Sequence, residues 1–168
     1  MLRILAAALF SVLLVPAAQA GGKKAEKLVV SFHLQGDPSE GPKHVFPQAT
    51  AGQQIHYRIS PEFGTKDIIA FATFPADDRV SYGLVLQLNK RARMRLTTIS
   101  IANRDNYMLA LVNGQIRDAV LIDRGVEDGL LVIWQRITAA EIRAADQIMP
   151  RIGMTQKQWK ANKKKKQP

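Results

Sequence analysis

The sequence predicts an α+β fold, in which a mainly antiparallel or mixed sheet carries two helices packed on one face. Short runs that alternate apolar and polar residues recur along the chain, as is typical of half-buried strands. Two other segments repeat apolar residues at helical spacing, each behind a residue that caps helix starts. An Asn-Gly pair between two apolar runs adds the signature of a tight β-hairpin.

Four strands are predicted in the first half of the chain. Residues 28–34 alternate between apolar and polar side chains, and residues 53–59 repeat that pattern. Between them, residues 35–52 are rich in Gly and Pro and are predicted to form a loop. Residues 67–74 and 80–88 are two further strand-like runs.

Two helices are predicted in the second half. The first begins behind Asn89, a good N-cap residue, and repeats apolar residues at helical spacing at Ala92, Leu96 and Ile99. The second begins behind Thr138, which forms a capping box with Glu141. Pro150 ends this second helix, because proline cannot continue the helical hydrogen-bond pattern.

Three strands are predicted between these helices. Residues 107–112 and 115–122 flank Asn113-Gly114, and Asn-Gly supplies the two positive φ angles that a type I′ hairpin turn needs. Residues 130–134 form a continuous apolar run, which is typical of a strand at the centre of a sheet.

The positive charge of the chain is concentrated at its two ends. The 168 residues include 24 Lys and Arg against 14 Asp and Glu, a formal net charge of +10, and no Cys. Residues 28–156 hold 14 basic and 13 acidic residues, a net charge of +1. A nearly neutral body does not have the basic face of a nucleic-acid-binding domain, and the missing Cys excludes disulfides, thiol catalysis and Cys-based zinc sites.

The N-terminus has the pattern of a secretory signal peptide over residues 1–20. Arg3 precedes a short apolar run over residues 4–15, and Ala18-Gln19-Ala20 suits signal cleavage. An uncleaved N-terminal anchor is the alternative. We therefore expect an exported protein, periplasmic or secreted, whose residues 21–27 form a flexible basic N-terminus ahead of a single domain over residues 28–152.

The C-terminus over residues 153–168 has no periodic apolar face and is predicted to be a disordered, Lys-rich tail. We expect this tail to bind an anionic membrane surface or polymer. The residues expected to make that contact are Lys157, Trp159, Lys160, Lys163, Lys164, Lys165 and Lys166. A tail that only keeps the protein in solution is the alternative.

Neither a metal site nor a cofactor site is predicted. The three histidines, His33, His44 and His56, lack metal-ligand spacing and are interpreted as solvated surface residues. His33 and His56 would be neighbours only if their two strands pair. The acidic loop formed by Asp123, Glu127 and Asp128 lacks the spacing of a calcium-binding loop and is interpreted as a solvated turn.

The protein is not expected to be an enzyme. The sequence has no nucleophile elbow, no phosphate-binding loop and no dinucleotide fingerprint. A small hydrolase with an unrecognised site is kept as an alternative. It would require a deep pocket in which polar side chains face one another, drawn from His33, His56, Asp67 and Asp123.

A set of turn and core residues in the second half resembles the pattern of a known family. The matching positions are Leu88, Asn89, Asn103, Leu109, Ala110, Asn113, Gly114, Ile116, Ile122, Asp128, Gly129, Ile133, Thr138 and Glu141. With them the chain resembles the head subdomain of the first periplasmic domain of SecD, a subunit of the SecDF protein-export complex, most strongly over residues 65–149. Val120 and Asp128 depart from that pattern, which has Pro and Gly there.

This resemblance implies a stand-alone, exported copy of the SecD head, a domain that contacts unfolded polypeptide. We therefore expect a non-enzymatic binding module of the cell envelope, whose open sheet edge takes protein or peptide partners as an added strand. A sheet edge covered by residues 28–60 is the alternative. A surface or structural protein held by its basic tail is the second functional hypothesis, and nucleic acid is not expected as a partner.

Overall fold

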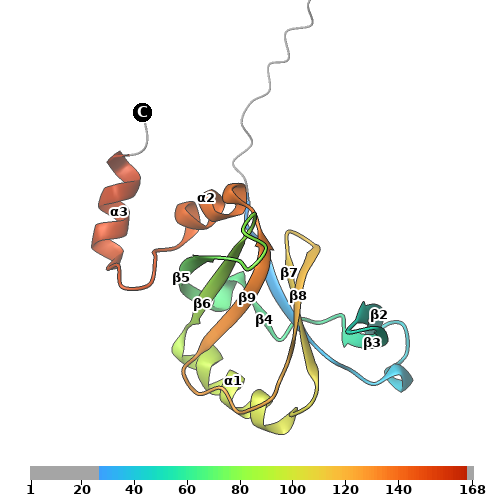
Figure 1. The fold of residues 1–168 in the computed structure, drawn as a ribbon. Coiled ribbons are helices and arrows are strands. Elements are labelled where there is room, and N and C mark those ends of the chain that lie inside the picture. Colours follow the sequence, from blue (N-terminus) through green and yellow to red (C-terminus); the bar gives the residue numbers. More distant parts are fainter. Residues whose placement is uncertain (1–26, 166–168) are drawn as a thin grey trace, which may run out of the picture.

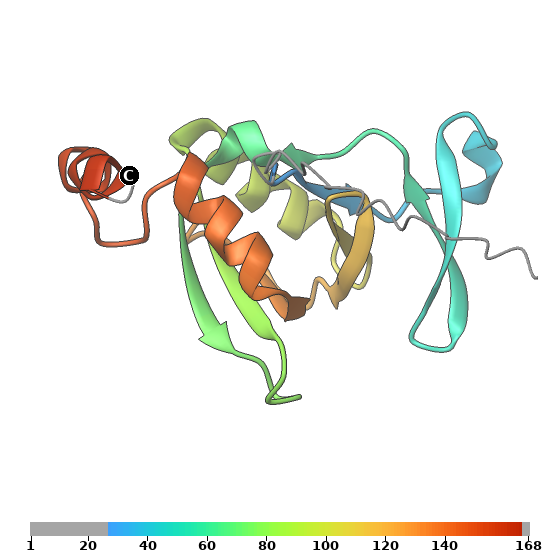
Figure 2. The same cartoon turned by 90° about the horizontal axis from the view of Figure 1, so that it is seen from above.

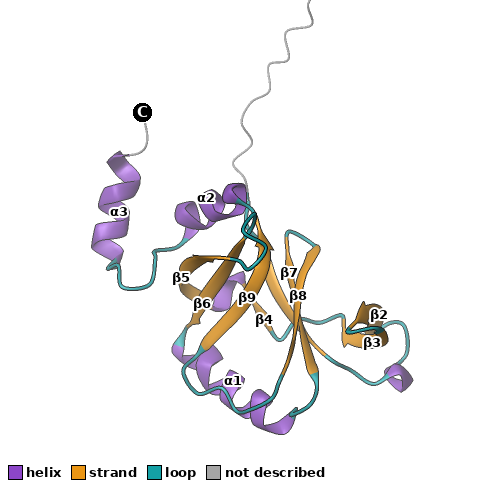
Figure 3. Ribbon diagram, in the orientation of Figure 1, coloured by secondary structure: helices purple, strands orange, loops and turns teal. Residues whose placement is uncertain are grey.

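The computed structural model describes residues 27–165, and the predicted signal peptide and residues 21–26 lie outside the described residues (Figure 1). The strands are β1 (Val30–Leu34), β2 (Val45–Thr50), β3 (Gln53–Arg58), β4 (Phe63–Gly64), β5 (Ile68–Pro75), β6 (Tyr82–Leu88), β7 (Tyr107–Val112), β8 (Gln115–Leu121) and β9 (Leu130–Ile137). The α-helices are α1 (Lys90–Ala102), α2 (Ala139–Ile148) and α3 (Gln156–Lys165), and short 3-10 turns lie at Pro38–Glu40 and Thr65–Asp67 (Figure 3).

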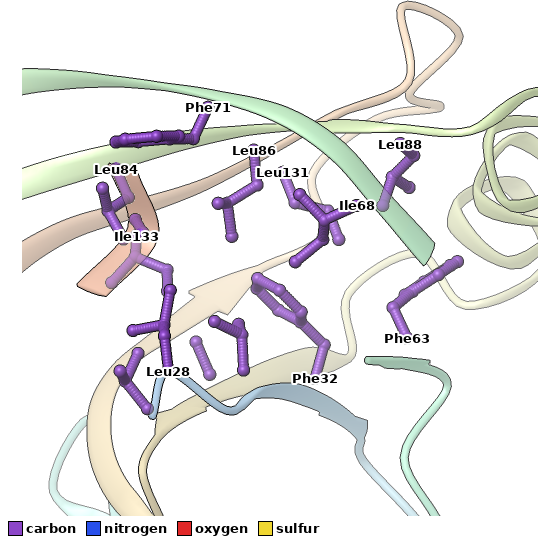
Figure 4. Packing of buried hydrophobic residues seen from close by; sticks show 14 of the residues in the cluster. Leu28, Phe32, Phe63, Ile68, Phe71, Leu84, Leu86, Leu88, Leu131 and Ile133 are labelled. Atoms are coloured by element: carbon purple, nitrogen blue, oxygen red, sulfur yellow. The ribbon is translucent and has the colours of Figure 1, made fainter. Parts of the chain in front are cut away.

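The strands form three antiparallel sheets, with the orders β4-β1-β7-β8, β5-β6-β9 and β2-β3. The two larger sheets share one hydrophobic core with side chains from α1 and α2. Phe32, Phe71, Leu86 and Ile133 lie within this core (Figure 4). Mixed α and β elements around one core confirm the predicted α+β class.

The helices α1 and α2 lie at opposite ends of the β5-β6-β9 sheet, on the same side of it (Figures 1 and 2). The Oδ1 of Asn89 accepts the N–H of Ala92 at 2.9 Å at the start of α1, as the N-cap prediction requires. The Thr138–Glu141 capping box is present at the start of α2. Among residues 27–165, no helix combines the length and apolar character needed to cross a bilayer.

The predicted loop over residues 35–52 is wrong in its second part, because that part forms β2. Pro47 lies inside β2, and it is tolerated there because the β2-β3 hairpin is a two-stranded sheet with free edges. Ala51 and Gly52 have φ angles of 50° and 78°, which makes the tight turn between the strands. The hairpin packs through Ile55 and Tyr57 against Leu109, on the face of the four-stranded sheet that points away from the main core.

The strand predicted over residues 130–134 is present as β9, but its predicted place at the centre of a sheet is wrong. β9 is the last strand of the order β5-β6-β9 and pairs only with β6. The run is apolar because both faces of β9 have apolar neighbours: Leu131 and Ile133 are buried in the core, and the half-exposed ring of Trp134 on the other face packs edge to face against Phe74. The continuous apolar run of residues 130–134 therefore reflects apolar neighbours on both faces of β9, and it does not indicate a strand at the centre of the sheet.

The C-terminus also differs from the predicted disordered tail, because residues 156–165 form α3. Thr155 and Gln158 exchange hydrogen bonds as a capping box, with Gln158 N–H donating to Thr155 Oγ1 at 3.2 Å and Thr155 N–H donating to Gln158 Oε1 at 2.9 Å. Trp159 then fixes the helix on α2, since its Nε1–H donates to the carbonyl of Asp146 at 2.9 Å. The contact of Trp159 with α2 thus holds α3 in place, although the segment lacks a periodic apolar face.

Candidate binding groove between two strand edges

A groove lies between β8 and β9, which run side by side without a hydrogen-bonded ladder in the described chain. It has a volume of about 260 Å³ and is mostly apolar. Buried Phe32, Leu96 and Met108 form its floor, and the exposed side chains of Leu121 and Trp134 stand at its mouth. Hereafter it is called the edge groove.

The peptide groups of β9 alternate in direction, and this identifies those that face the edge groove. The C=O of Gly129 accepts the N–H of the last residue of β6 at 2.9 Å, so it points toward β6. The N–H of Trp134 points away from β6, because it donates to the Oδ2 of Asp118 on β8 at 2.8 Å. Alternate residues of a strand direct their peptide groups to the same side. The peptide groups of Leu130, Val132 and Trp134 therefore face the groove.

The carboxylate of Asp118 connects the two strand edges. Its Oδ2 accepts the N–H of Trp134 on β9 at 2.8 Å, and its Oδ1 accepts the N–H of Ala119 on β8 at 2.9 Å. We call this arrangement the Asp118 clip. At the other end of the groove, Oδ1 of Asp128 accepts the N–H of Leu130 at 2.9 Å. Two carboxylates thus occupy positions where a neighbouring strand would place its carbonyl oxygens.

Both faces of the sheet are apolar along the free edge of β9. Leu131 and Ile133 point into the core, and Val132 and Trp134 lie on the outer face. The ring of Trp134 meets the ring of Phe74 edge to face, with centroids 5.8 Å apart. An additional strand beside β9 would therefore find apolar neighbours for its side chains on both faces.

Gly83 on β6 sets the position of this aromatic pair. A Cβ at residue 83 would lie 2.1 Å from the Cζ of Phe74, so the Phe74 ring lies directly over the glycine. The β6-β9 ladder is irregular just beyond this point, between Tyr82 and Leu84, and Arg136 on β9 has a φ of 65°. A bulge of this kind bends a strand and increases its local twist.

The other edges of the two main sheets are shorter than those of β8 and β9, or are partly covered. The N–H of Phe71 on β5 donates to the carbonyl of Pro150 at 3.1 Å, and the N–H of Ile152 donates back to the carbonyl of Phe71 at 2.8 Å. The edge strand β4 has only two residues. Segment 28–60 covers one sheet edge, since its strand β1 pairs with β7, but no strand of this segment pairs with the edges of β8 and β9 that face the edge groove. The edges that face the groove are thus the longest ones left for an added strand.

The strands that carry His33 and His56, β1 and β3, belong to different sheets. His33 is buried, with 8% of its surface exposed, so its interpretation as a solvated surface residue is wrong. It is buried because its Nδ1–H donates to the carbonyl of Arg58 at 2.8 Å, its Nε2 accepts the hydroxyl of Ser31 at 2.9 Å, and its ring packs against Phe46. Within residues 27–165, no three His, Cys, Asp or Glu side chains gather as a metal site would require.

The four polar residues considered for a hydrolase lie in separate places. Asp67 is buried, and its Oδ2 accepts the N–H of Gly64 at 3.0 Å and Nη2–H of Arg95 at 3.3 Å. His56 lines a shallow hollow near the β2-β3 hairpin, and Asp123 lines the edge groove. None of these surroundings forms the facing pair that a hydrolase would need.

The expected tail site is divided between two faces of α3. Trp159 and Lys163 turn toward α2, since the Nζ of Lys163 donates to the carbonyl of Gln147 at 2.8 Å. Lys157 and Lys160 are exposed. The side chains of Lys164 and Lys165, and the whole of Lys166, lie outside the described residues.

Asp118, Val132 and Trp134 could not be identified from the sequence as binding residues. The available signal was the carboxylate of Asp118 at a half-buried strand position, which needs a hydrogen-bond donor nearby. Nothing in the residue pattern shows that this donor belongs to the edge of another sheet.

Two solved structures of SecDF have a fold that is similar to the fold of this chain. One, described as the crystal structure of SecDF in a super-membrane-facing form, has a TM-score of 0.49 and 11% identity over 72% of this chain and 19% of that chain. The other, described as a membrane component that enhances protein export, has the same TM-score and identity over 79% of this chain and 70% of that chain. No protein-family profile and no curated protein matches the sequence. The more specific identification with the SecD head stays a prediction.

Proposed function

We propose that the protein is a non-enzymatic binding module that takes an extended polypeptide segment as an added strand along the free edge of β9. The observation that carries this proposal is the outward direction of the peptide groups of Leu130, Val132 and Trp134, which face a groove and not a paired strand. Backbone hydrogen bonds to such an edge tolerate many sequences, because every residue except proline offers the same N–H and C=O groups.

The lining of the edge groove favours a particular kind of segment. A strand beside β9 would direct one set of alternate side chains over the buried floor formed by Phe32 and Met108. The other set would lie on the outer face beside Val132 and Trp134. A segment that is apolar at successive positions fits both faces, and folded proteins keep such segments inside their cores. The groove therefore suits polypeptide that is unfolded or not yet folded.

Binding would exchange one set of hydrogen bonds for another. The N–H groups of Trp134 and Leu130 now donate to Asp118 and Asp128, and incoming carbonyls would take these two places. The clip keeps a long apolar edge from pairing at random with other chains, which is the hazard that free edges carry.

The test compares two synthetic peptides by isothermal titration calorimetry. The first has a run of Val, Ile and Thr residues flanked by Lys for solubility, and the second is the same peptide with N-methyl groups on every residue of the run, so that neither edge keeps its N–H donors. The methyl groups remove the N–H donors that an added strand needs. We expect binding of the first peptide and loss of binding for the second. Equal binding of both would contradict strand addition.

A variant of the protein tests the same hydrogen bonds by removing an N–H donor from β9 and not from the peptide. Val132→Pro removes an N–H that faces the groove, which leaves the ladder with β6 intact because proline is tolerated where the N–H points outward. We expect this variant to lose the peptide, while Val132→Thr, which keeps the N–H, retains it. Circular dichroism checks that both variants fold. If Val132→Pro does not fold, the N-methylated peptide alone decides the result.

A further inference from the structure

One face of α3 is fixed on the C-terminal end of α2 (Figure 1). Trp159 Nε1–H donates to the carbonyl of Asp146 at 2.9 Å, and Lys163 Nζ donates to the carbonyl of Gln147 at 2.8 Å. Carbonyls in the last turn of a helix have no partner within that helix, and this end of a helix attracts cations. The ammonium of Lys163 also lies 5.4 Å from the centre of the Trp159 ring.

The other face of α3 is a basic surface. Lys157 and Lys160 are exposed, three positions apart, and neither takes part in an ion pair among the described residues. Residues three apart lie on the same side of a helix. Residues 157–168 contain six Lys and no Asp or Glu, so no acidic residue of this segment offsets the charge.

A hollow between α2 and α3, beside the side of α3 that faces α2, holds further basic residues. It has a volume of about 530 Å³, and its cationic lining residues are Arg143, Arg151 and Lys163. The acidic residue in the lining is Asp146, which already forms two hydrogen bonds with Arg151, at 2.9 and 3.0 Å. Arg143 is exposed and forms no ion pair in the described chain, so its charge is available to an anion.

The first described residue lies beside the start of α2, the helix whose other end holds α3. Lys27, the first described residue, lines a hollow together with Ala140, Glu141 and Ala144 of α2. The export predicted from residues 1–20 favours an anionic lipid surface over a nucleic acid as the partner of the basic helix.

We propose that the α2–α3 end of the protein docks on an anionic bilayer, and that lysine and arginine charges hold it there. Phosphate groups of the lipid headgroups would lie against Lys157, Lys160 and Arg143. Trp159 stays on α2 and does not enter the bilayer, which changes the role that the sequence suggested for it. This docking is independent of the edge groove.

The first experiment measures sedimentation of the purified protein with vesicles of phosphatidylglycerol and phosphatidylcholine, and with vesicles of phosphatidylcholine alone. We expect binding to the anionic vesicles that weakens as salt rises. Each Lys near an anionic surface contributes ~1 kcal/mol, so the double variant Lys157→Gln/Lys160→Gln should bind roughly 25-fold more weakly. Arg143→Gln should add a further weakening of roughly 5-fold.

A matched control removes the same charge from the opposite end of the molecule. Lys90 and Arg91 are exposed at the start of α1, far from α3 (Figure 1). Lys90→Gln/Arg91→Gln should leave vesicle binding unchanged. If both double variants weaken binding equally, the effect comes from net charge alone and the proposed docking end is wrong.

Two more measurements separate this proposal from its alternatives. In a Trp134→Phe background, Trp159 is the one remaining Trp of the chain, and we expect brominated lipids to leave its fluorescence unquenched. Quenching would show insertion of Trp159 and overturn the proposed geometry. Binding to duplex DNA at the same salt, tighter than binding to the anionic vesicles, would identify a nucleic acid as the partner instead.

Discussion

Removal of the Asp118 carboxylate tests the clip that joins the two strand edges. Asp118 accepts two backbone N–H groups, one from Ala119 and one from Trp134. Buried hydrogen bonds to charged groups contribute about 1.5–3 kcal/mol each, and these are partly exposed, so each should contribute about 1 kcal/mol. We therefore expect Asp118→Ala to lower the free energy of unfolding by about 2 kcal/mol.

The same substitution should strengthen peptide binding. In the unchanged protein, a peptide carbonyl must displace Asp118 from the N–H of Trp134. Without the carboxylate that bond does not have to be broken, and about 1 kcal/mol corresponds to an affinity higher by roughly 5-fold. A variant that is less stable but binds more tightly is the signature of a group that competes with the ligand.

Urea unfolding and calorimetry with the Val-Ile-Thr peptide measure both effects. Asp118→Asn is the matched control, because its single amide oxygen can accept from one edge more easily than from both. We expect it to fall between the natural protein and Asp118→Ala in stability and in affinity. An unchanged urea midpoint in Asp118→Ala would refute the clip, and a weaker affinity would refute its competition with the ligand.

Three further predictions concern stability and titration at other places in the fold. Gly83→Ala should lower the free energy of unfolding by about 2 kcal/mol, because its Cβ would overlap the Phe74 ring; a smaller loss in the Phe74→Leu background, measured by urea unfolding, identifies that ring as the cause. Glu141→Gln should cost about 3 kcal/mol, because Arg117 Nη2 lies 2.6 Å from Glu141 Oε1 in a mostly buried pair, and thermal unfolding that matches the natural protein would contradict this. Hydrogen bonds from Ser81 and Val80 hold the pKa of Asp78 below its ordinary value, so the stability they give is present at neutral pH and is lost as pH falls through that lowered pKa. The NMR titration midpoint of Asp78 should rise in Ser81→Ala, and an unmoved midpoint would show that the Ser81 hydroxyl does not cause the shift.

The strands and helices that carry local signals could be predicted from the sequence. Alternation identified β1 and β3, and the Asn113-Gly114 pair placed the β7-β8 hairpin correctly. Capping residues located the starts of α1 and α2 within a residue. These signals act over a few residues, so a single sequence contains them completely.

The features that depend on distant contacts could not be predicted. β2 contains Pro47 and was taken for a loop, because only its pairing with β3 shows that proline is tolerated there. α3 lacks an apolar face, and it is ordered by the bond from Trp159 to a carbonyl of α2. His33 became a core residue because its ring nitrogens find a carbonyl and a hydroxyl on neighbouring segments.

The edge groove shows the same limit most clearly. An apolar run such as residues 130–134 fits a central strand and an edge strand with apolar faces equally well. Sheet order decides between them, and it is set by which strands pair across the whole fold. The role of the Asp118 carboxylate is visible only in the structure, where its Oδ2 accepts the N–H of Trp134 on the other strand at 2.8 Å.

Amide hydrogen exchange along β9, measured with and without the Val-Ile-Thr peptide, tests strand addition most directly. The N–H groups of Leu130, Val132 and Trp134 face the groove, while those of Leu131 and Ile133 already face β6. Strand addition predicts that the peptide slows exchange at Val132, whose N–H faces the groove between the two amides that carboxylates hold, and leaves Leu131 and Ile133 unchanged. Protection spread evenly over all five residues, or none at Val132, would contradict it.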